Sequence, residues 1–537
     1  MSSSRDFFEA AGIFCLSLIL FTWGVSSQEV IGFESRFYLF ALEMWHDGVS
    51  WFPTAYHQLY PDYPATSTFL IDLTASFMGH MNKLAAVIPS ALAAAVTVTM
   101  TYLIGSLRNK LWGLYGVFFL LLTVMFLKSA RSINLDIYPA MITACCFYII
   151  YSANVKDMRS REVFIYPLLM LGFAFRGPIG LVIPTGVICA YYLQDANFKK
   201  LFFYGMFAIL ILVICTLLLL TLADIYGGHE FVHDVLRMEV VGRMEKSHLP
   251  VYFYFTNGLR DYALSFPLAL MTALGIIYYE QRLHYHTPEL KLLLKLFGWI
   301  LVVMIGMSIP GDKKIRYILP IAPAIALLAA YPFIAPKGER YFSCLRWALL
   351  RLFIIFPVIL FIGLRLVMSY AAKHAMDFNI NYLLMTQILF GALACSFLVF
   401  FCLGKKEKWR DTGVLLIATF SFVLCYLTVA EPIEQYIDKT HQFVMEVEQA
   451  RKHNHAKLVF YRETPDSLPI KYLINMPTEE TPDFIQDEQG LMMYSSPAFF
   501  VTSEAYFKEL SPVTAGQLHV IARDKIGHVP VVVFTNR

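Results

Sequence analysis

Long runs of apolar residues, separated by short polar loops, recur over the first 430 residues of the chain. A run of about 18–22 apolar residues can cross the hydrocarbon core of a membrane as a helix, so the pattern predicts about thirteen spanning helices. They are expected near residues 11–25, 84–107, 111–127, 137–153, 163–175, 178–193, 201–223, 263–279, 292–309, 318–333, 348–371, 382–403 and 414–430. The short pair around Arg176 is either two half-length crossings or a re-entrant element. The predicted fold class is an all-α polytopic membrane protein.

Lysine and arginine gather in alternate loops of this pattern, at residues 108–110, 156–161, 199–200, 337–346 and 405–410. Short loops rich in these residues stay on the cytoplasmic side of a membrane. The N-terminus is then inside, and an odd number of crossings puts the C-terminal tail outside. Two long hydrophilic loops, 26–83 and 224–261, are expected on the same outer face of a cytoplasmic (inner) membrane.

The composition changes after residue 430. Segment 431–537 is polar and contains strand-like pieces at 457–461, 518–522 and 529–534. This pattern predicts a small α/β domain outside the membrane, after a membrane domain of residues 1–430. The segment has no glycine-rich phosphate loop and no catalytic signature, so no chemistry is assigned to it.

The overall composition excludes two classes of protein. Hydrophobic residues make up 58% of the 537 positions and charged residues only 15%, whereas soluble proteins are about 25% charged. The chain is therefore not a water-soluble enzyme. Its 43 basic residues barely exceed its 40 acidic ones, so it lacks the basic surplus of a nucleic-acid-binding protein.

The first outer loop carries the first candidates for chemistry. Apolar residues at helical spacing over 37–44 predict an amphipathic helix along the membrane surface, and Glu34 and Arg36 stand at its start. A carboxylate at a helix start is also what an ordinary capped surface helix shows. Further along, Tyr60 and Asp62 lie in a turn that two prolines make rigid.

Charged residues also lie at the outer boundary of later spans. Arg131 and Asp136 lie at the mouth of two spans, where a simple ion pair explains them equally well. Arg176 interrupts apolar sequence, and ionisable residues among spans are functional hypotheses by default. A later outer segment holds three cations against the positive-inside rule, which indicates a fixed anion nearby. This segment contains Lys313, Lys314, Arg316 and Tyr317.

The second long loop contains two further candidates. Arg243 lies four residues after Glu239, so the two share a helix face. His248 precedes a proline and a cluster of aromatic residues typical of an interfacial turn. A lone histidine in such a loop is either an ordinary surface residue or a metal ligand.

Taken in order, these outer-face motifs resemble the polytopic GT-C glycosyltransferases that use lipid-linked sugars, namely the bacterial aminoarabinose transferases acting on lipid A and the protein O-mannosyltransferases. The resemblance rests on Phe33-Glu-Ser-Arg-Phe37 with Glu43-Met44, Tyr60-Pro-Asp-Tyr-Pro64, Ala130-Arg131 with Leu135-Asp136, Arg176-Gly-Pro178, His248 before an aromatic run, and Tyr317-Ile-Leu-Pro320. It covers most of the membrane region and implies a GT-C fold with a small outer domain.

The resemblance implies transfer of a sugar from a polyprenyl-phosphate donor, with inversion, to lipid A, another glycan or a protein. Glu34 is the expected catalytic base, because the first acid of the family's motif is Phe33 here. Asp62 and His248 are expected to hold a divalent metal ion, with Zn, Mg and Mn all compatible. Donor phosphate and substrate contacts are expected from Arg36, Tyr60, Arg131, Asp136, Arg176, Arg243, Lys313, Lys314, Arg316 and Tyr317.

Two other functions compete with sugar transfer. A transporter would also have a dozen or so spans with charged residues among them, although transporters place these residues near the membrane midplane. A metalloprotease is indicated by an H-E-x-x-H motif at His229 and His233. No third ligand follows that motif at a recognised spacing, so the protease is the weakest alternative.

Overall fold

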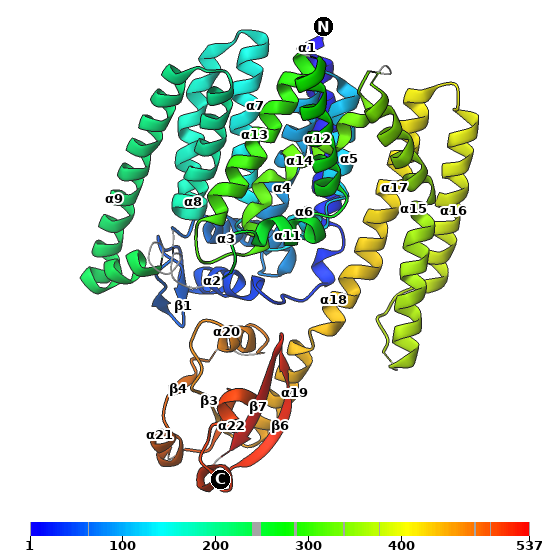
Figure 1. Cartoon of the computed structure of the whole chain (residues 1–537). Helices are drawn as coiled ribbons and strands as arrows, with labels where there is room; N and C mark the ends of the chain where they lie inside the picture. The colour runs from blue at the N-terminus through cyan, green and yellow to red at the C-terminus, as the bar shows by residue number, and fades with distance from the viewer. Residues whose placement is uncertain are drawn as a thin grey trace.

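The computed structural model describes residues 2–62, 64–238, 249–283, 287–336, 339–374, 376–476, 480–494 and 496–535. Figure 1 shows a bundle of long helices with a smaller α/β unit below one end. The N-terminus lies at the other end of the bundle, and the C-terminus lies in the α/β unit. The described residues are therefore arranged as a membrane bundle with a polar unit at one of its ends.

The helices of the bundle follow the predicted apolar runs. Their bounds are α1 (Ser2–Thr22), α2 (Glu34–Asp47), α3 (Thr66–Met78), α4 (Lys83–Ser106), α5 (Lys110–Leu121), α6 (Val124–Ala130), α7 (Ile137–Lys156), α8 (Ile165–Gln194), α9 (Phe198–Leu236), α11 (Phe253–Asp261), α12 (Ser265–Leu283), α13 (Pro288–Ser308), α14 (Ala322–Ala330), α15 (Arg340–Lys373), α16 (Tyr382–Cys402) and α17 (Glu407–Cys425). Short 3₁₀ turns η1 (Val25–Ser27), η2 (Arg159–Phe164), η4 (Ile315–Ile321) and η5 (Tyr331–Phe333) adjoin them. Among the described residues, ten helices are long and apolar enough to cross a membrane, or up to twelve if each bent pair is one span.

A reversal of the chain inside α8 accounts for the remaining predicted crossing. Arg176 and Gly177 leave helical geometry there, with φ angles of −142° and 57°. A Cβ atom on Gly172 would lie 2.2 Å from the carbonyl oxygen of Gly180, although residues eight apart on a straight helix are separated by about 12 Å. The two halves of α8 therefore pack antiparallel, with their backbones in contact because both residues are glycine. These halves correspond to the predicted crossings 163–175 and 178–193.

The layer between the bundle and the α/β unit is made by the first outer loop and two bends. The chain turns by 80° between α5 and α6 and by 115° between α11 and α12. In Figure 1, α2, α3, α6 and α11 lie near the end of the bundle that faces the α/β unit. The described parts of the long loops 26–83 and 224–261 thus share one end with the C-terminal tail.

The last span runs into the α/β unit without a break. After α17 the chain continues through the π-helix η6 (Tyr426–Ala430) into α18 (Glu431–Ile437). The change to polar sequence at residue 431 therefore falls inside a continuous helix rather than at a linker. The orientation of the α/β unit is in this way coupled to the last membrane helix.

The α/β unit is a five-stranded sheet with helices on both faces. Its elements are α19 (Thr440–His453), β3 (Lys457–Tyr461), α20 (Leu468–Leu473), β4 (Asp483–Ile485), α21 (Glu488–Met493), β5 (Ala498–Ser503), α22 (Glu504–Lys508), α23 (Pro512–Ala515), β6 (His519–Ile526) and β7 (Val529–Thr535), with strand order β4-β3-β5-β7-β6. Strand β3 pairs parallel with β4 and β5, and β7 pairs antiparallel with β5 and β6. Successive side chains of β3 point to opposite faces of the sheet. Leu458 and Phe460 are buried against α19 and α20, while Val459 and Tyr461 pack toward α21 and α22.

Candidate functional site

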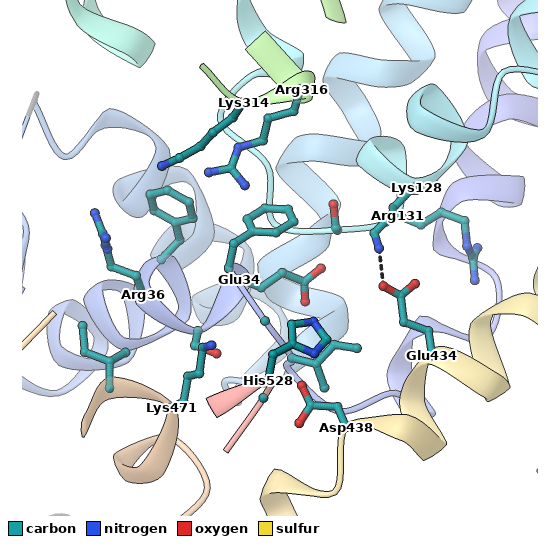
Figure 2. A pocket seen from close by; sticks show the side chains of 18 of the residues that line it. Glu34, Arg36, Lys128, Arg131, Lys314, Arg316, Glu434, Asp438, Lys471 and His528 are labelled. Atoms are coloured by element: carbon teal, nitrogen blue, oxygen red, sulfur yellow. Dashed lines mark hydrogen bonds and ion pairs between the residues drawn. The ribbon is translucent and has the colours of Figure 1, made fainter. Parts of the chain in front are cut away.

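A cavity of about 820 Å³ lies between the end of the bundle and the α/β unit. Its walls come from the starts of α2 and α4, the end of α6, the reversal in α8, the start of η4 with the segment before it, helices α18 and α20, and the β6–β7 turn. Figure 2 shows charged side chains from these elements converging on it. Of the residues expected from the sequence, it brings together Glu34, Arg36, Asp62, Arg131, Arg176, Lys314, Arg316 and Tyr317.

Glu34 is held at the first turn of α2, at the centre of this cavity (Figure 2). The residue is only 4% exposed, and its Oε2 lies 3.0 Å from Nζ of Lys83, the first residue of α4. The Lys83 amine also donates to the carbonyl oxygen of Glu29, at 2.7 Å. Burial raises the pKa of the Glu34 carboxyl, while the Lys83 ammonium and the Ile133 backbone N–H lower it in part. A buried carboxylate with a raised pKa is a stronger base than a solvated one.

A group of four cations borders the cavity beside Glu34: Arg36, Arg176, Lys314 and Arg316. Asp136 is shared by two of them, because its Oδ1 lies 2.8 Å from Nε of Arg176 and its Oδ2 lies 3.0 Å from Nε of Arg316. Asp136 thereby positions the two guanidinium groups next to each other. The Arg316 guanidinium also lies over the ring of Phe33, 4.3 Å from its centroid. An aromatic face thus stands where the related motif has its first acid, and it adds no negative charge.

The electrostatic field of the four-cation group is positive. Burial lowers the pKa of the Lys314 amine, and nearby Arg316, Arg36 and Arg176 lower it further, against the opposite effect of Asp312. The Asp312 carboxylate is 3.9 Å from the Lys314 amine, and it also accepts a hydrogen bond from the Tyr317 hydroxyl at 3.0 Å. In a half-buried cavity, neighbouring cations disfavour one another's charged forms. A bound oxyanion such as phosphate relieves this repulsion.

Arg131 borders the cavity but is bound by other groups of the protein. Its guanidinium contacts both carboxylate oxygens of Glu431, at 2.6 and 2.8 Å, and donates to backbone carbonyls at the end of α1. Beside it, Lys128 pairs with Glu434 (Figure 2). These two pairs fasten α6 to α18. Arg131 therefore serves the packing of the last span, and the sequence-based assignment to the donor phosphate does not account for its contacts.

Lys313, Tyr60 and Asp136 are expected substrate contacts that do not line the cavity itself. The buried Lys313 amine donates to the carbonyl oxygen of Leu249, at 3.2 Å. The Tyr60 hydroxyl donates to Asp466 of the α/β unit at 2.6 Å. Lys313 and Tyr60 thus hold loops around the site, and Asp136 acts through the two arginines it bridges. Arg243 and His248 lie outside the described residues.

The α/β unit supplies residues that the sequence did not point to. Asp438, Lys471 and His528 line the cavity from its lower side (Figure 2). His528 follows Gly527, whose φ of 60° forms the β6–β7 turn and whose N–H donates to Thr440 at 2.8 Å. A glycine between two strand-like pieces signals such a turn, but only the tertiary fold brings it over α2.

The described residues contain one group whose geometry could hold a metal ion: Glu43, Asp47 and His57, with ligand atoms within 4.8 Å of one another. Nδ1 of His57 lies 2.6 Å from Asp47, and the Glu43 carboxylate accepts the N–H groups of Tyr56 and His57. Tyr56 and His57 both have positive φ in the turn between β1 (Thr54–Ala55) and β2 (Gln58–Leu59). Glu43 therefore stabilises a strained hairpin, and Asp62 is not one of the three residues of the group.

The H-E-x-x-H motif is found on the surface. His229 is almost fully exposed and lies 3.5 Å from Asp224, and His233 is also exposed. Gly228 interrupts α9 directly before the motif, with a φ of 72°. Within the described residues neither histidine belongs to a group of three ligands. The geometry gives no support to a protease site there.

The comparisons with known proteins agree with this architecture. The sequence model of the dolichyl-phosphate-mannose-protein mannosyltransferase family matches residues 62–219, less than a third of the chain. No curated protein sequence matches the chain. The fold is that of a GT-C membrane protein, which the structural comparisons show.

Two solved structures carry this conclusion, and both are of ArnT from Cupriavidus metallidurans. The apo structure is similar with a TM-score of 0.70 and 13% identity, over 99% of this chain and 98% of that one. The structure bound to undecaprenyl phosphate is similar with a TM-score of 0.65 and 16% identity, over 97% of each chain. At this identity the likeness establishes the shared fold of the bundle and the α/β unit together.

Proposed function

We propose that the chain is a membrane glycosyltransferase that moves a sugar from a polyprenyl-phosphate donor to an acceptor hydroxyl or amine at the outer face of the cytoplasmic membrane. The observation that carries the proposal is the juxtaposition of a buried, partly compensated carboxylate, Glu34, with the four-cation group. The partial match to the mannosyltransferase family and the fold shared with ArnT support the same class of reaction.

The proposed reaction is a single displacement. The acceptor oxygen or nitrogen bonds to the anomeric carbon as the bond from that carbon to the donor phosphate oxygen breaks, and the acceptor proton passes to Glu34. Polyprenyl phosphate leaves with the electron pair of the broken bond. Fixed cations stabilise the charge that grows on the leaving phosphate, which is the role of Lys314, Arg316 and Arg36. Attack opposite the leaving group inverts the anomeric configuration.

The position of the cavity supports a lipid-linked donor. Its floor is the end of the membrane bundle, so a polyprenyl chain can stay in the bilayer while its phosphate reaches the four-cation group. Bound undecaprenyl phosphate in the related ArnT structure supports a lipid phosphate as the donor carrier. The acceptor would enter from the side of Lys471 and His528, and lipid A, another glycan or a protein all fit this scheme.

A divalent metal ion would be held by Asp62 together with His248. Asp62 is 4% exposed and borders the cavity, and a buried carboxylate is a ligand that divalent cations accept. When bound, the ion would add positive charge beside the donor phosphate. Glu43, Asp47 and His57 form the rival location, with an N/O donor set that suits Zn or Mn.

The decisive experiment incubates the purified full-length protein with radiolabelled polyprenyl-phosphate sugars and with lipid A, glycan and peptide acceptors. Label should appear in one acceptor class, with an equal amount of polyprenyl phosphate released. Glu34→Gln serves as the matched inactive control. Absence of transfer from every donor, combined with uptake of label into proteoliposomes, would contradict the proposal and indicate a transporter.

A further inference from the structure

A second cavity lies at the opposite end of the bundle, where the sequence predicts the cytoplasmic face. It has a volume of about 380 Å³ and is formed by the α4–α5 loop, the C-terminal ends of α7 and α8, and the starts of α9 and α13. Figure 1 shows that this end is the one that carries the N-terminus, away from the α/β unit. It is therefore separate from the site around Glu34.

The lining of this second cavity is strongly cationic. Five basic side chains border it and, among the described residues, a single carboxylate, Asp195, does so; the cations are Arg108, Arg159, Lys200, Lys291 and Lys295. Lys295 pairs with Asp195 at 2.7 Å. Lys200 pairs with Glu162 at 2.8 Å and Arg159 with Asp157 at 3.6 Å, and both of these acids lie outside the lining. Within the described part of the chain, Arg108 and Lys291 have no acidic partner. The cavity thus concentrates positive charge that the protein itself leaves uncompensated.

Two tyrosines fix two of the cations, Lys295 and Arg108, in place. The Lys295 amine lies over the ring of Tyr191, 3.5 Å from its centroid, although Lys295 is two turns inside α13 and only 7% exposed. The Arg108 Nε donates to the Tyr151 hydroxyl at 2.5 Å. Cation–π contacts and hydrogen bonds of this kind order long basic side chains. A general basic belt that only follows the positive-inside rule needs neither a recess nor a buried amine.

We propose that this cavity binds the phosphodiester headgroup of an anionic phospholipid. Basic pockets between membrane helices on the cytoplasmic side are suited to such headgroups. The shared chemistry is a phosphate oxyanion, which free phosphate could also offer. The lipid is favoured because residues at the ends of the membrane helices α7, α8 and α13 line the cavity, and acyl chains can lie along these helices.

The test measures lipid retention by the full-length protein with native mass spectrometry, titrating phosphatidylglycerol against zwitterionic phosphatidylcholine. The double variant Arg108→Gln/Lys291→Gln should lose about fivefold in phosphatidylglycerol affinity per cation, or about 25-fold in all. The matched control Lys405→Gln/Lys408→Gln removes two exposed cations at the same end, outside the cavity. It should bind like the wild type.

A third variant should raise the affinity for phosphatidylglycerol instead of lowering it. Asp195→Asn removes the single acid among the described lining residues and should tighten phosphatidylglycerol binding, because Lys295 then needs another counter-ion. Equal losses in both double variants would show a general basic surface and overturn the proposal, as would unchanged binding in Arg108→Gln/Lys291→Gln. Displacement of the lipid by millimolar inorganic phosphate would reassign the site to free phosphate.

Discussion

Replacing Lys83 with methionine should move the pH dependence of transfer without removing the catalytic group. In the proposed reaction Glu34 must be ionised, so activity falls as the pH drops through its pKa. The Lys83 ammonium favours the ionised form, because its Nζ lies 3.0 Å from Glu34 Oε2. Without this cation, the effect of burial is less opposed and the pKa of Glu34 rises further. The acidic limb of the rate profile should therefore shift to higher pH.

The size of the shift follows from the pair geometry. Two unit charges about 3 Å apart at an effective dielectric constant of about 20 interact by about 5.5 kcal/mol, equivalent to about four pH units. Water that replaces the amine recovers part of this energy, and opposite charges near a carboxyl typically shift its pKa by about 1–3 units. An upward shift of about 1–3 pH units is thus expected for Lys83→Met.

The assay is single-turnover transfer at saturating donor, measured across pH for wild type, Lys83→Met and Lys83→Arg. Lys83→Arg keeps the charge and should retain the wild-type limb, which separates electrostatics from packing. Lys128→Met is the matched control in the same cavity, because the Lys128 ammonium lowers the pKa of Glu34 less than the Lys83 ammonium does. If Lys83→Met is active and the acidic limb of its pH–rate profile lies at the same pH as in the wild type, Glu34 is not the titrating base.

The remaining predictions concern the base, the cations and the metal. Glu34→Gln should keep the fold and donor binding but lower turnover about 10²–10⁴-fold in a transfer assay; wild-type turnover would exclude Glu34. Lys314→Met should weaken donor binding and slow transfer together with no loss of thermal stability, whereas Arg131→Met should cost about 3–5 kcal/mol of stability because it leaves Glu431 buried without its partner. Metal analysis should show loss in Asp62→Ala and normal content in His57→Ala; the reverse result would place the metal at the Glu43, Asp47 and His57 group.

The membrane helices could be predicted from the sequence because the length of an apolar run is a local property. The thirteen expected spans all fall on helices or helix halves of the bundle. The sequence around Arg176 is compatible both with two short crossings and with a re-entrant element. The physical basis of the reversal there is the backbone contact between Gly172 and Gly180, which depends on where the chain turns and not on the residues in either half alone.

The roles of the charged residues of the site could not be predicted from the local sequence, because they depend on partners far away in the chain. Lys83 is the first residue of a span and follows the capping Asn82. At such a position the sequence indicates a lysine that anchors the helix at the membrane interface. Its partner Glu34 lies in another helix. Arg131 is the converse case: its motif resembles a substrate contact, but its guanidinium is bound by Glu431, 300 residues later, and by backbone carbonyls at the end of α1. An acid directly after an apolar span was the available signal for such a pair.

The ion pairs divide the cavity into a side with little net charge and a side with excess positive charge. On the side of α18, Arg131 and Lys128 are matched by Glu431 and Glu434, so that wall has little net charge to offer a phosphate. On the opposite side the cations outnumber the acids, and burial together with the neighbouring arginines lowers the pKa of Lys314. Under the proposed reaction the donor phosphate therefore belongs on the Lys314 side, and the acceptor must approach Glu34 from the α/β unit. Because α17 and α18 form one continuous helix, any tilt of the last span would move that approach path relative to the donor.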